Sequence, residues 1–505
     1  MRPVKGGDQH CNRIGRHASS FWSFERPLTQ AIVDWHRSCL NLGTYWLRHI
    51  ASNLQPACQK TGKNSRPYPK VTDFQLRGGG MKIAFFTNAF PMMSEAFIVN
   101  SAAALIDAGH SVDIFGIGNV DATGLSVPEA EPLQLEKSTT NIRWPDTSAG
   151  RWKGLPGTLG RLVSRHGVSG LTRIQPGTYR RTFMDLSAFY QAAQIPADGA
   201  YDIIHCQFAP LAEHVIKHRR AGFLSGRLVV NFRGYDISEL VTLHGEHLYD
   251  HIWPEADAFI SNSDYFRQRA IAIGCPEDRI SVVGSGMRLE SFPFQPIEEA
   301  PAGDMRFLMV GRLIERKGFH IALPALSRFA QATGRRVHVD IVGDGPLRAD
   351  LEQLAQDCGL GGCVTFHGAR SHTEIADFIR QCDVFIAPSM TCSKGSQDGP
   401  VNTLKEAMAI GRPVIGTRHG GISELVLDGE TGLLCEEGDI DALEQAVHRI
   451  LSLRDDWPQM LKNARTAVED TYALSRTTED LIDIYTAITA APSPKDTPRP
   501  SRKAA

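Results

Sequence analysis

Residues 306–318 read RFLMVGRLIERKG, an apolar run that ends in a glycine and is followed by a basic loop. The run RFLMVG (306–311) has the length and composition of a buried strand, and the loop after it leads into a helix. The alternation continues through VHVDIVG (337–343), VTFHG (364–368), VFIAPS (384–389) and PVIGT (413–417). Near-continuous apolar strands between helices are typical of a parallel sheet covered on both faces. These residues therefore predict an α/β fold.

A second series of the same kind precedes this one. Its predicted strands are KIAFFT (82–87), HSVDIFGIG (110–118), YDIIHCQF (201–208), RLVVNFRG (227–234) and DAFISNS (257–263). A helix over Phe97–Ala108 is expected to end at Gly109. Between the two series, FPFQPIEEAPAGD (292–304) has three prolines and little periodicity, which indicates a linker.

We therefore predict two Rossmann-like domains, one over 81–295 and one over 304–470. A helix over 471–490 and a disordered tail over 491–505 are expected to follow. Ligands of open parallel sheets bind beyond the carboxyl ends of the strands. Two such domains facing each other predict a site in the cleft between them.

The composition is that of a soluble globular protein: 42% of the 505 residues are apolar and 22% are charged. The 54 Lys and Arg nearly balance the 56 Asp and Glu, which argues against a nucleic-acid binder. No apolar run approaches the roughly 18–20 residues of a membrane-spanning helix, which excludes an integral membrane protein. The ten cysteines form no CxxC pair and indicate small buried residues in a reducing cytoplasm rather than a zinc site.

Residues 1–80 differ from the rest because they carry 12 basic and 4 acidic side chains and end in three glycines. They lack the pattern of a signal peptide. We predict a basic disordered extension or an over-extended gene start, with Met81 as the true first residue.

Three loops of the second series carry candidate chemistry. The first holds Arg312 and Lys317, two cations that suit a diphosphate, although solvated basic residues in a loop are an equally simple explanation. The second, DGPVNTLKEAMA (398–409), holds Asp398 and Glu406. Since proline favours the first helical position, a helix is expected to start near Pro400, with Asp398 in the loop before it. The free N–H groups of such a helix start suit a phosphate.

Glu406 would lie two turns inside that helix, where a carboxylate can accept hydrogen bonds from the two hydroxyls of a ribose. An ordinary amphipathic helix with a capping aspartate remains the alternative. The third loop, TRHGGISE (417–424), follows a predicted strand, and its paired glycines allow a ligand to approach the backbone closely.

Together these segments resemble the retaining GT-B glycosyltransferases of family 4, the glycosyl transferases group 1. The resemblance covers about residues 81–490 and rests on GRLIERKGF, VGDGPLRADLEQLA, VTFHGAR, the D-x7-E spacing and GGISELVLDGETGLL. In the N-terminal half, FPMMSEAFI (90–98) and HCQFAP (205–210) resemble the exopolysaccharide enzymes of the colanic acid and amylovoran type.

The resemblance implies a hexosyltransferase that uses a UDP- or GDP-linked sugar as co-substrate, with no cofactor and no metal. Arg312 and Lys317 would bind the donor diphosphate with the helix start, and Glu406 would hold the ribose. Asp398 would lie against the transferred sugar. The remaining implied site residues are Val401, Asn402 and Thr403 at the diphosphate, Gly420, Gly421 and Glu424 along the donor sugar, and Ser94, Glu95, His205, Arg233 and Asp236 in the N-terminal domain.

Two residues depart from the family pattern. Asp398 stands where the family usually has glutamate, and Arg233 stands where it usually has a histidine in His-Gly-x-Asp. A permanently charged guanidinium cannot shuttle protons, but it can hydrogen-bond a sugar hydroxyl or a phosphate. These departures leave open a nucleotide-binding partner subunit without activity. A nucleotide-sugar epimerase of the same fold is the other alternative.

The acceptor is expected to be a glycan or a lipid-diphosphate-linked saccharide. Residues 147–184 contain seven Lys or Arg and no acidic residue. This segment is interpreted either as a solvated loop or as a basic surface that contacts an anionic membrane. The expected location is the cytoplasm, with peripheral contact at the inner face of the cytoplasmic membrane.

Overall fold

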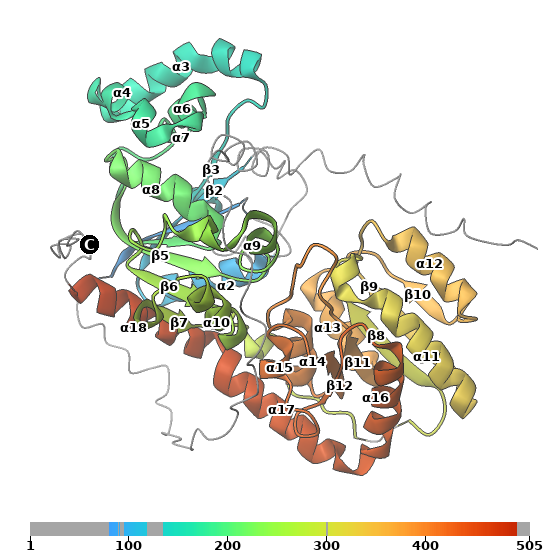
Figure 1. The fold of residues 1–505 in the computed structure, drawn as a ribbon. Coiled ribbons are helices and arrows are strands. Elements are labelled where there is room, and N and C mark those ends of the chain that lie inside the picture. Colours follow the sequence, from blue (N-terminus) through green and yellow to red (C-terminus); the bar gives the residue numbers. More distant parts are fainter. Residues whose placement is uncertain (1–79, 89, 91–94, 119–134, 299–300, 492–505) are drawn as a thin grey trace, which may run out of the picture. The chain divides into compact units, whose positions relative to one another are not determined.

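The computed structural model describes residues 80–88, 90, 95–118, 135–298 and 301–491. In this part of the chain the first series forms a seven-stranded parallel sheet with the order β3-β2-β1-β4-β5-β6-β7 (Figure 1). Its strands are β1 (Lys82–Thr87), β2 (Ser111–Ile117), β3 (Thr139–Ile142), β4 (Ala200–Cys206), β5 (Ser225–Phe232), β6 (Ala258–Ser261) and β7 (Ile280–Val282).

The second series forms a six-stranded parallel sheet with the order β10-β9-β8-β11-β12-β13. Its strands are β8 (Met305–Val310), β9 (Val337–Val342), β10 (Val364–Phe366), β11 (Val384–Ala387), β12 (Val414–Thr417) and β13 (Leu433–Cys435). In both sheets the order reverses direction beside the first strand, between β1 and β4 and between β8 and β11. This is the Rossmann arrangement, in which such reversal points bind ligands. The predicted α/β class with two Rossmann-like domains is confirmed, and the cleft expected between them stays a prediction.

Helices cover the first sheet, and the chain segment that joins β3 to β4 forms a further helical layer. The covering helices are α2 (Ala96–Asp107), α8 (Ala212–Arg220), α9 (Glu239–His244) and α10 (Asp264–Ala272). The separate layer consists of α3 (Ser148–His166), α4 (Ser169–Arg173), α5 (Pro176–Tyr179), α6 (Arg181–Met184) and α7 (Ser187–Ala192). The basic segment 147–184 lies in this layer, so describing it as a loop is wrong. Buried Thr158 and Leu162 on α3 supply the packing that holds the segment helical despite Pro156.

The helices of the second series are α11 (Phe319–Thr333), α12 (Arg348–Asp357), α13 (His372–Gln381), α14 (Asn402–Ile410), α15 (Ile422–Leu425), α16 (Ile440–Ser452), α17 (Trp457–Tyr472) and α18 (Leu474–Ala490). The expected C-terminal helix starts at Leu474 rather than 471, because Ala473 is extended and separates it from α17. The buried face of α18 belongs to the first core, to which it contributes Leu481 and Tyr485, and the helix packs beside α2 (Figure 1, red).

All ten predicted strands are present, and three further strands were missed. These are β3, β7 and β13, which have three or four residues each and lie at the edges of the sheets. A run that short shows no periodicity, and pairing with the neighbouring strand is what makes it a strand. The predicted linker is held against the second core, since the N–H groups of Gln295 and Ile297 donate to carbonyls at the end of α14.

The predictions for the N-terminal extension and for Ser94 fall on residues 1–79 and 91–94, outside those described. The same holds for nearly all of the predicted tail, of which residue 491 alone is described. None of the helices within the described ranges combines the length and the apolar character that crossing a bilayer requires.

Candidate active site

The loops after β8 and β11 meet where the strand order of the second sheet reverses. Gly318 has a left-handed backbone (φ 65°), and a Cβ added there would lie 1.8 Å from the Pro388 carbonyl oxygen. A side chain at this position would therefore push the two loops apart. The stem of Lys317 lies over Gly311, with its carbons 3.4 Å from where a Cβ would be. These two glycines allow Lys317 to reach the segment that follows β11.

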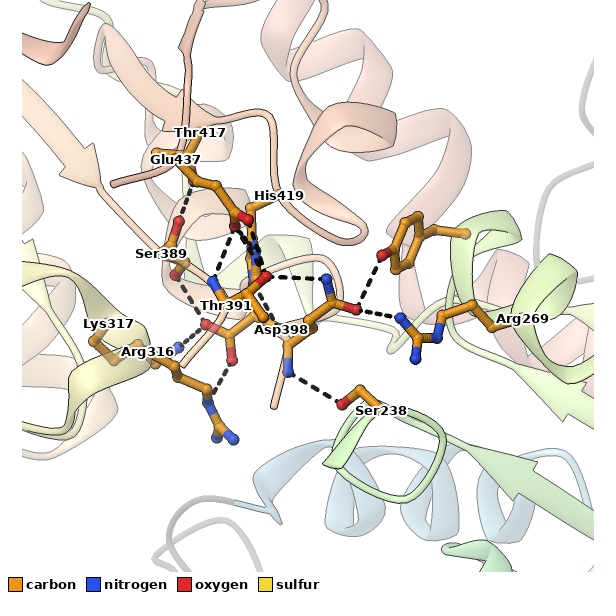
Figure 2. A network of polar contacts seen from close by, with 12 residues as sticks. Ser238, Arg269, Arg316, Lys317, Ser389, Thr391, Asp398, Thr417, His419 and Glu437 are labelled. Atoms are coloured by element: carbon orange, nitrogen blue, oxygen red, sulfur yellow. Dashed lines mark hydrogen bonds and ion pairs between the residues drawn. The ribbon is translucent and has the colours of Figure 1, made fainter. Parts of the chain in front are cut away.

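Asp398 is the centre of the polar network in Figure 2. Its Oδ2 accepts hydrogen bonds from Lys317 Nζ at 2.9 Å and from Ser389 Oγ at 2.8 Å, and Arg316 Nε lies 2.9 Å from Oδ1. Burial disfavours the charged carboxylate, but Lys317 and Arg316 outweigh that effect and hold the pKa of Asp398 well below its usual range. Asp398 is therefore a buried, ionised carboxylate between two cations.

The backbone of Asp398 is held as firmly as its side chain. Its N–H donates to His419 Nε2 at 2.9 Å, and its carbonyl accepts from Gly421 N at 3.2 Å. A Cβ at Gly420, which has φ 49°, would lie 2.0 Å from the Asp398 carbonyl oxygen. The paired glycines thus serve contact between two loops of the chain.

The helix that carries Glu406 starts at Asn402, two residues later than predicted, because Val401 keeps an extended backbone (ψ 124°). Val401 is the N-cap, so Asn402 and Thr403 supply free N–H groups of the first turn. Glu406 is 5% exposed, and its Oε2 has no hydrogen-bond partner among the described residues; neither does the buried Oγ1 of Thr403. The other carboxylate oxygen of Glu406, Oε1, lies 3.7 Å from His372 Nδ1. Buried polar atoms are rarely left unpaired, so the 403/406 face of α14 is suited to a polar ligand.

Lys405 lies beside Glu406 and is 1% exposed. Its Nζ donates to the Ser285 carbonyl at 2.7 Å and lies 4.6 Å from the centre of the Tyr472 ring. Burial lowers the pKa of Lys405 to about 7, with Arg233 acting in the same direction and Glu406 opposing it.

Replacing Lys405 by methionine is expected to remove a rise in stability with pH. An unfolded lysine holds its proton up to its ordinary pKa of 10.5, whereas the folded protein loses it near 7. The unfolded state therefore binds more protons between pH 7 and 10.5, and the native protein becomes more stable as the pH rises through that window. Urea unfolding at pH 7 and pH 9.5 measures the difference. Lys462→Met, on the exposed side of α17, is the control and should keep the rise; a rise that persists in Lys405→Met would contradict the assignment.

Arg233 follows β5, and its side chain is held by several neighbouring residues. Its guanidinium donates to the Gln207 side chain at 2.8 Å, to the Gln207 carbonyl at 3.2 Å and to Ser285 Oγ at 3.0 Å, and it stacks over Phe97 at 4.2 Å. Burial lowers the pKa of Arg233 to about 10, which leaves it charged at neutral pH. Arg233 and Lys405 thus hold Ser285 through its hydroxyl and its carbonyl.

The other N-terminal candidates are buried and engaged. Asp236 accepts hydrogen bonds from the backbone N–H groups of 233, 234, 237 and 209, so its carboxylate stabilises the turn after β5. His205 Nδ1 lies 2.7 Å from the Tyr485 hydroxyl of α18, and burial lowers the pKa of His205 to about 3. Glu95 precedes α2 and accepts from Thr87 Oγ1 at 3.0 Å; burial raises its pKa to about 7.

Glu424, expected along the donor sugar, makes contacts with the first series. Its two carboxylate oxygens accept from the backbone N–H groups of Asp264 (2.8 Å) and Tyr265 (2.6 Å) at the start of α10. Gln397 makes a similar connection, since its backbone N–H donates to Ser238 Oγ and its side-chain oxygen accepts from Tyr265 and Arg269 (Figure 2). Arg312 is exposed, and no hydrogen bond or ion pair of its side chain is found within the described ranges.

Sequence reasoning missed several residues of this site. Arg316 stands next to the predicted Lys317, but spacing alone does not show that both cations reach Asp398. Ser389, His419 and Glu437 are far apart in the chain, and their loops converge only when the sheet forms. The available signal was weak: Ser389 ends a predicted strand and His419 follows another, whereas Glu437 follows β13, which the sequence did not predict.

Residues 292–467 match the family described as Glycosyl transferases group 1, and residues 94–286 match the Glycosyl transferase 4-like domain. The putative colanic acid biosynthesis glycosyltransferase WcaL of Salmonella typhimurium is 33% identical over 373 residues, which cover 72% of this chain and 89% of WcaL. The chain belongs to the group 1 glycosyl transferases. It is a glycosyltransferase, as the resemblance predicted.

Other proteins are also similar to this chain in sequence or in fold. The amylovoran biosynthesis glycosyltransferase AmsK of Erwinia amylovora is 30% identical over 394 residues, covering 77% of this glycosyltransferase and 95% of AmsK. A solved glycosyltransferase from Rickettsia africae matches with a TM-score of 0.57 at 18% identity, covering 81% of this chain and 98% of that one. HepE of Anabaena in complex with UDP-glucose also has a TM-score of 0.57 at 18% identity, covering 81% and 100%. These structures share the GT-B fold with the chain.

Proposed function

We propose that this glycosyltransferase is a hexosyltransferase that acts in exopolysaccharide biosynthesis. It would move a sugar from a UDP- or GDP-linked donor to a glycan or a lipid-diphosphate-linked saccharide. The observation that carries the proposal is the face of α14 beside the ionised Asp398, where Glu406 and Thr403 have buried oxygens that find no partner among the described residues. The names of WcaL and AmsK, colanic acid and amylovoran biosynthesis glycosyltransferases, support the pathway class.

The donor diphosphate would be bound by Arg312, Lys317 and the first turn of α14 at 401–403. An ammonium group has three N–H donors. Lys317 donates one of them to Asp398, so the others can bind a phosphate oxygen. The exposed Arg312 can move to the same phosphates. Negative charge develops on the leaving phosphate during glycosyl transfer, and fixed cations and helix N–H groups stabilise it. We propose that these groups suffice without a metal.

The carboxylates of Glu406 and Asp398 would contact the other two parts of the donor, the ribose and the transferred sugar. Glu406 would accept hydrogen bonds from the ribose hydroxyls, which supplies partners for its buried oxygen. Asp398 would face the transferred sugar, beside Gly420, Gly421 and Glu424. Transfer would retain the anomeric configuration by attack on the same face as the leaving group, with the leaving phosphate accepting the proton of the acceptor hydroxyl.

In the N-terminal half, Arg233 would be a positioning residue. Its guanidinium already donates hydrogen bonds to Gln207 and Ser285, which supports this role. Asp236 would shape the same turn through its four backbone hydrogen bonds. Glu95 and His205 remain second candidates there.

The helical layer α3–α7 would contact an anionic membrane surface at the inner face of the cytoplasmic membrane. Support comes from its seven basic and no acidic side chains over 147–184, and from Trp152 and Met184, which are 64% and 79% exposed. Cosedimentation with phosphatidylglycerol vesicles at low and high salt tests this contact.

Calorimetric titration of the full chain with UDP, GDP and ADP tests the donor assignment. One of the first two nucleotides is expected to bind, and ADP is expected to bind more weakly. Binding needs no knowledge of the acceptor, so it can be measured first. If no nucleotide binds and no donor is turned over with a membrane extract, the proposal of an active sugar transferase is wrong for this chain.

A further inference from the structure

His419 and Glu437 form a hydrogen-bonded pair behind Asp398, with the His419 ring buried and Glu437 partly exposed. His419 belongs to the loop after β12, and its side chain is fully buried. Its Nε2 lies 2.9 Å from the backbone nitrogen of Asp398. A backbone amide can only donate, so Nε2 must carry a lone pair, and the ring proton must be on Nδ1.

Glu437 faces that proton. Its Oε2 makes a short contact with His419 Nδ1 and also accepts from the backbone N–H of Thr391 at 2.9 Å. The Thr391 hydroxyl donates to the same carboxylate at 2.9 Å and accepts from the Gln397 side chain at 3.1 Å (Figure 2). Three donors therefore meet one carboxylate. A carboxylate accepts on both oxygens and donates on neither, so it holds the histidine in the Nδ1–H form.

We propose that Glu437 and His419 are positioning residues that set the place of Asp398 against the donor sugar. Glu437 fixes the ring tautomer, and the ring then fixes the Asp398 backbone through Nε2. This inference rests on the proposed role of Asp398. For histidines that bind a metal, mutation of the partner that fixes the tautomer commonly costs about 10–100-fold in affinity or activity, and we use this range as a guide.

The proposal separates sugar recognition from nucleotide recognition. Arg312, Lys317 and Glu406 would bind the nucleotide part, and none of them contacts His419 or Glu437 in the described structure. A disturbance of the pair should therefore weaken binding of a nucleotide sugar much more than binding of the bare nucleotide. A merely structural role would weaken both together or lower the melting temperature alone.

Glu437→Gln is the test substitution because it keeps the shape and changes one acceptor oxygen into a donor. If the amide NH2 group faces the ring, the ring takes its proton on Nε2 and faces the Asp398 N–H with a second N–H. If the NH2 group faces the Thr391 hydroxyl instead, the ring keeps only a neutral acceptor and the hydroxyl loses the carboxylate oxygen to which it donates. Affinities for UDP, UDP-glucose, UDP-galactose, GDP and GDP-mannose are measured by calorimetry. The affinity for the preferred nucleotide sugar is expected to fall about 10-fold, while that for its nucleotide changes less than twofold.

Glu436→Gln is the matched control, since Glu436 is adjacent and its carboxylate pairs with Arg418 at the surface. It should change neither affinity. His419→Gln offers an amide oxygen in place of Nε2, so it should bind the nucleotide sugar better than His419→Ala. Equal loss in both histidine variants, or a Glu437→Gln variant that behaves like Glu436→Gln, overturns the proposal.

Nitrogen-15 spectra of the histidine-labelled full chain read the tautomer directly, with the His419→Gln variant assigning the signal. The proton is expected on Nδ1 in the native protein, and a native ring protonated on Nε2 overturns the proposal whatever the affinities. If Asp398→Asn leaves sugar recognition intact, the proposed role of Asp398 fails instead. The tautomer result stands apart from that outcome, so the two failures are distinguishable.

Discussion

Replacing Asp398 by asparagine is expected to lower sugar transfer on the order of 100-fold and to destabilise the fold. Asparagine has the same shape but no charge, so Lys317 and Arg316 would be left without their carboxylate. Removing one partner of a buried ion pair costs about 3 kcal/mol or more of unfolding free energy. Nucleoside diphosphate release from the donor with a membrane extract measures the first effect, and urea unfolding measures the second.

The Asp398→Glu variant separates charge from geometry. It restores the carboxylate and adds one methylene, which gives the residue type that the resembling family usually has here. We expect it to recover most of the lost stability, because both cations regain a partner. Full activity and unchanged stability in Asp398→Asn would contradict the placement of this carboxylate at the donor sugar.

Glu406→Ala is expected to weaken nucleotide binding by about 1.5–3 kcal/mol, which is roughly 10-fold to 150-fold in affinity. The reason is the buried Oε2 of Glu406, which has no hydrogen-bond partner in the described part of the chain and is suited to two ribose hydroxyls. A charged acceptor that binds two hydroxyls in a buried site contributes more than a neutral one. The loss should appear equally for the nucleotide and for its sugar conjugate, because both contain the ribose.

Glu444→Gln provides the comparison for this titration. Glu444 lies on α16 and pairs with Arg328 and His448 at distances near 3.9 Å, so it should not change nucleotide affinity. A deoxyribose nucleotide offers a second comparison, since its loss of affinity should shrink in Glu406→Ala. Unchanged nucleotide affinity in Glu406→Ala would remove Glu406 from the ribose site.

The alternation of apolar runs and helices in the sequence predicts both sheets. β1 and β8 are buried on both faces, so nearly every residue in them had to be apolar, and such runs are visible in a sequence. β3 and β13 are short edge strands that exist because a neighbour pairs with them, so no local pattern could reveal them. Helix α14 was predicted from Gly399-Pro400 and starts two residues later, within the usual uncertainty of helix ends.

The sequence by itself determined the class of fold, ten of the strands along the chain and the segments that carry Lys317, Asp398 and Glu406. Those features are local, because each depends on residues within one strand, turn and helix. Only the tertiary structure decided that Arg316 pairs with Asp398 and that α18 returns to the first core. It also decided that a histidine 21 residues away holds the Asp398 backbone. Such contacts join separate loops at the carboxyl ends of parallel strands, and their partners are chosen by the packing of the sheet rather than by distance along the chain.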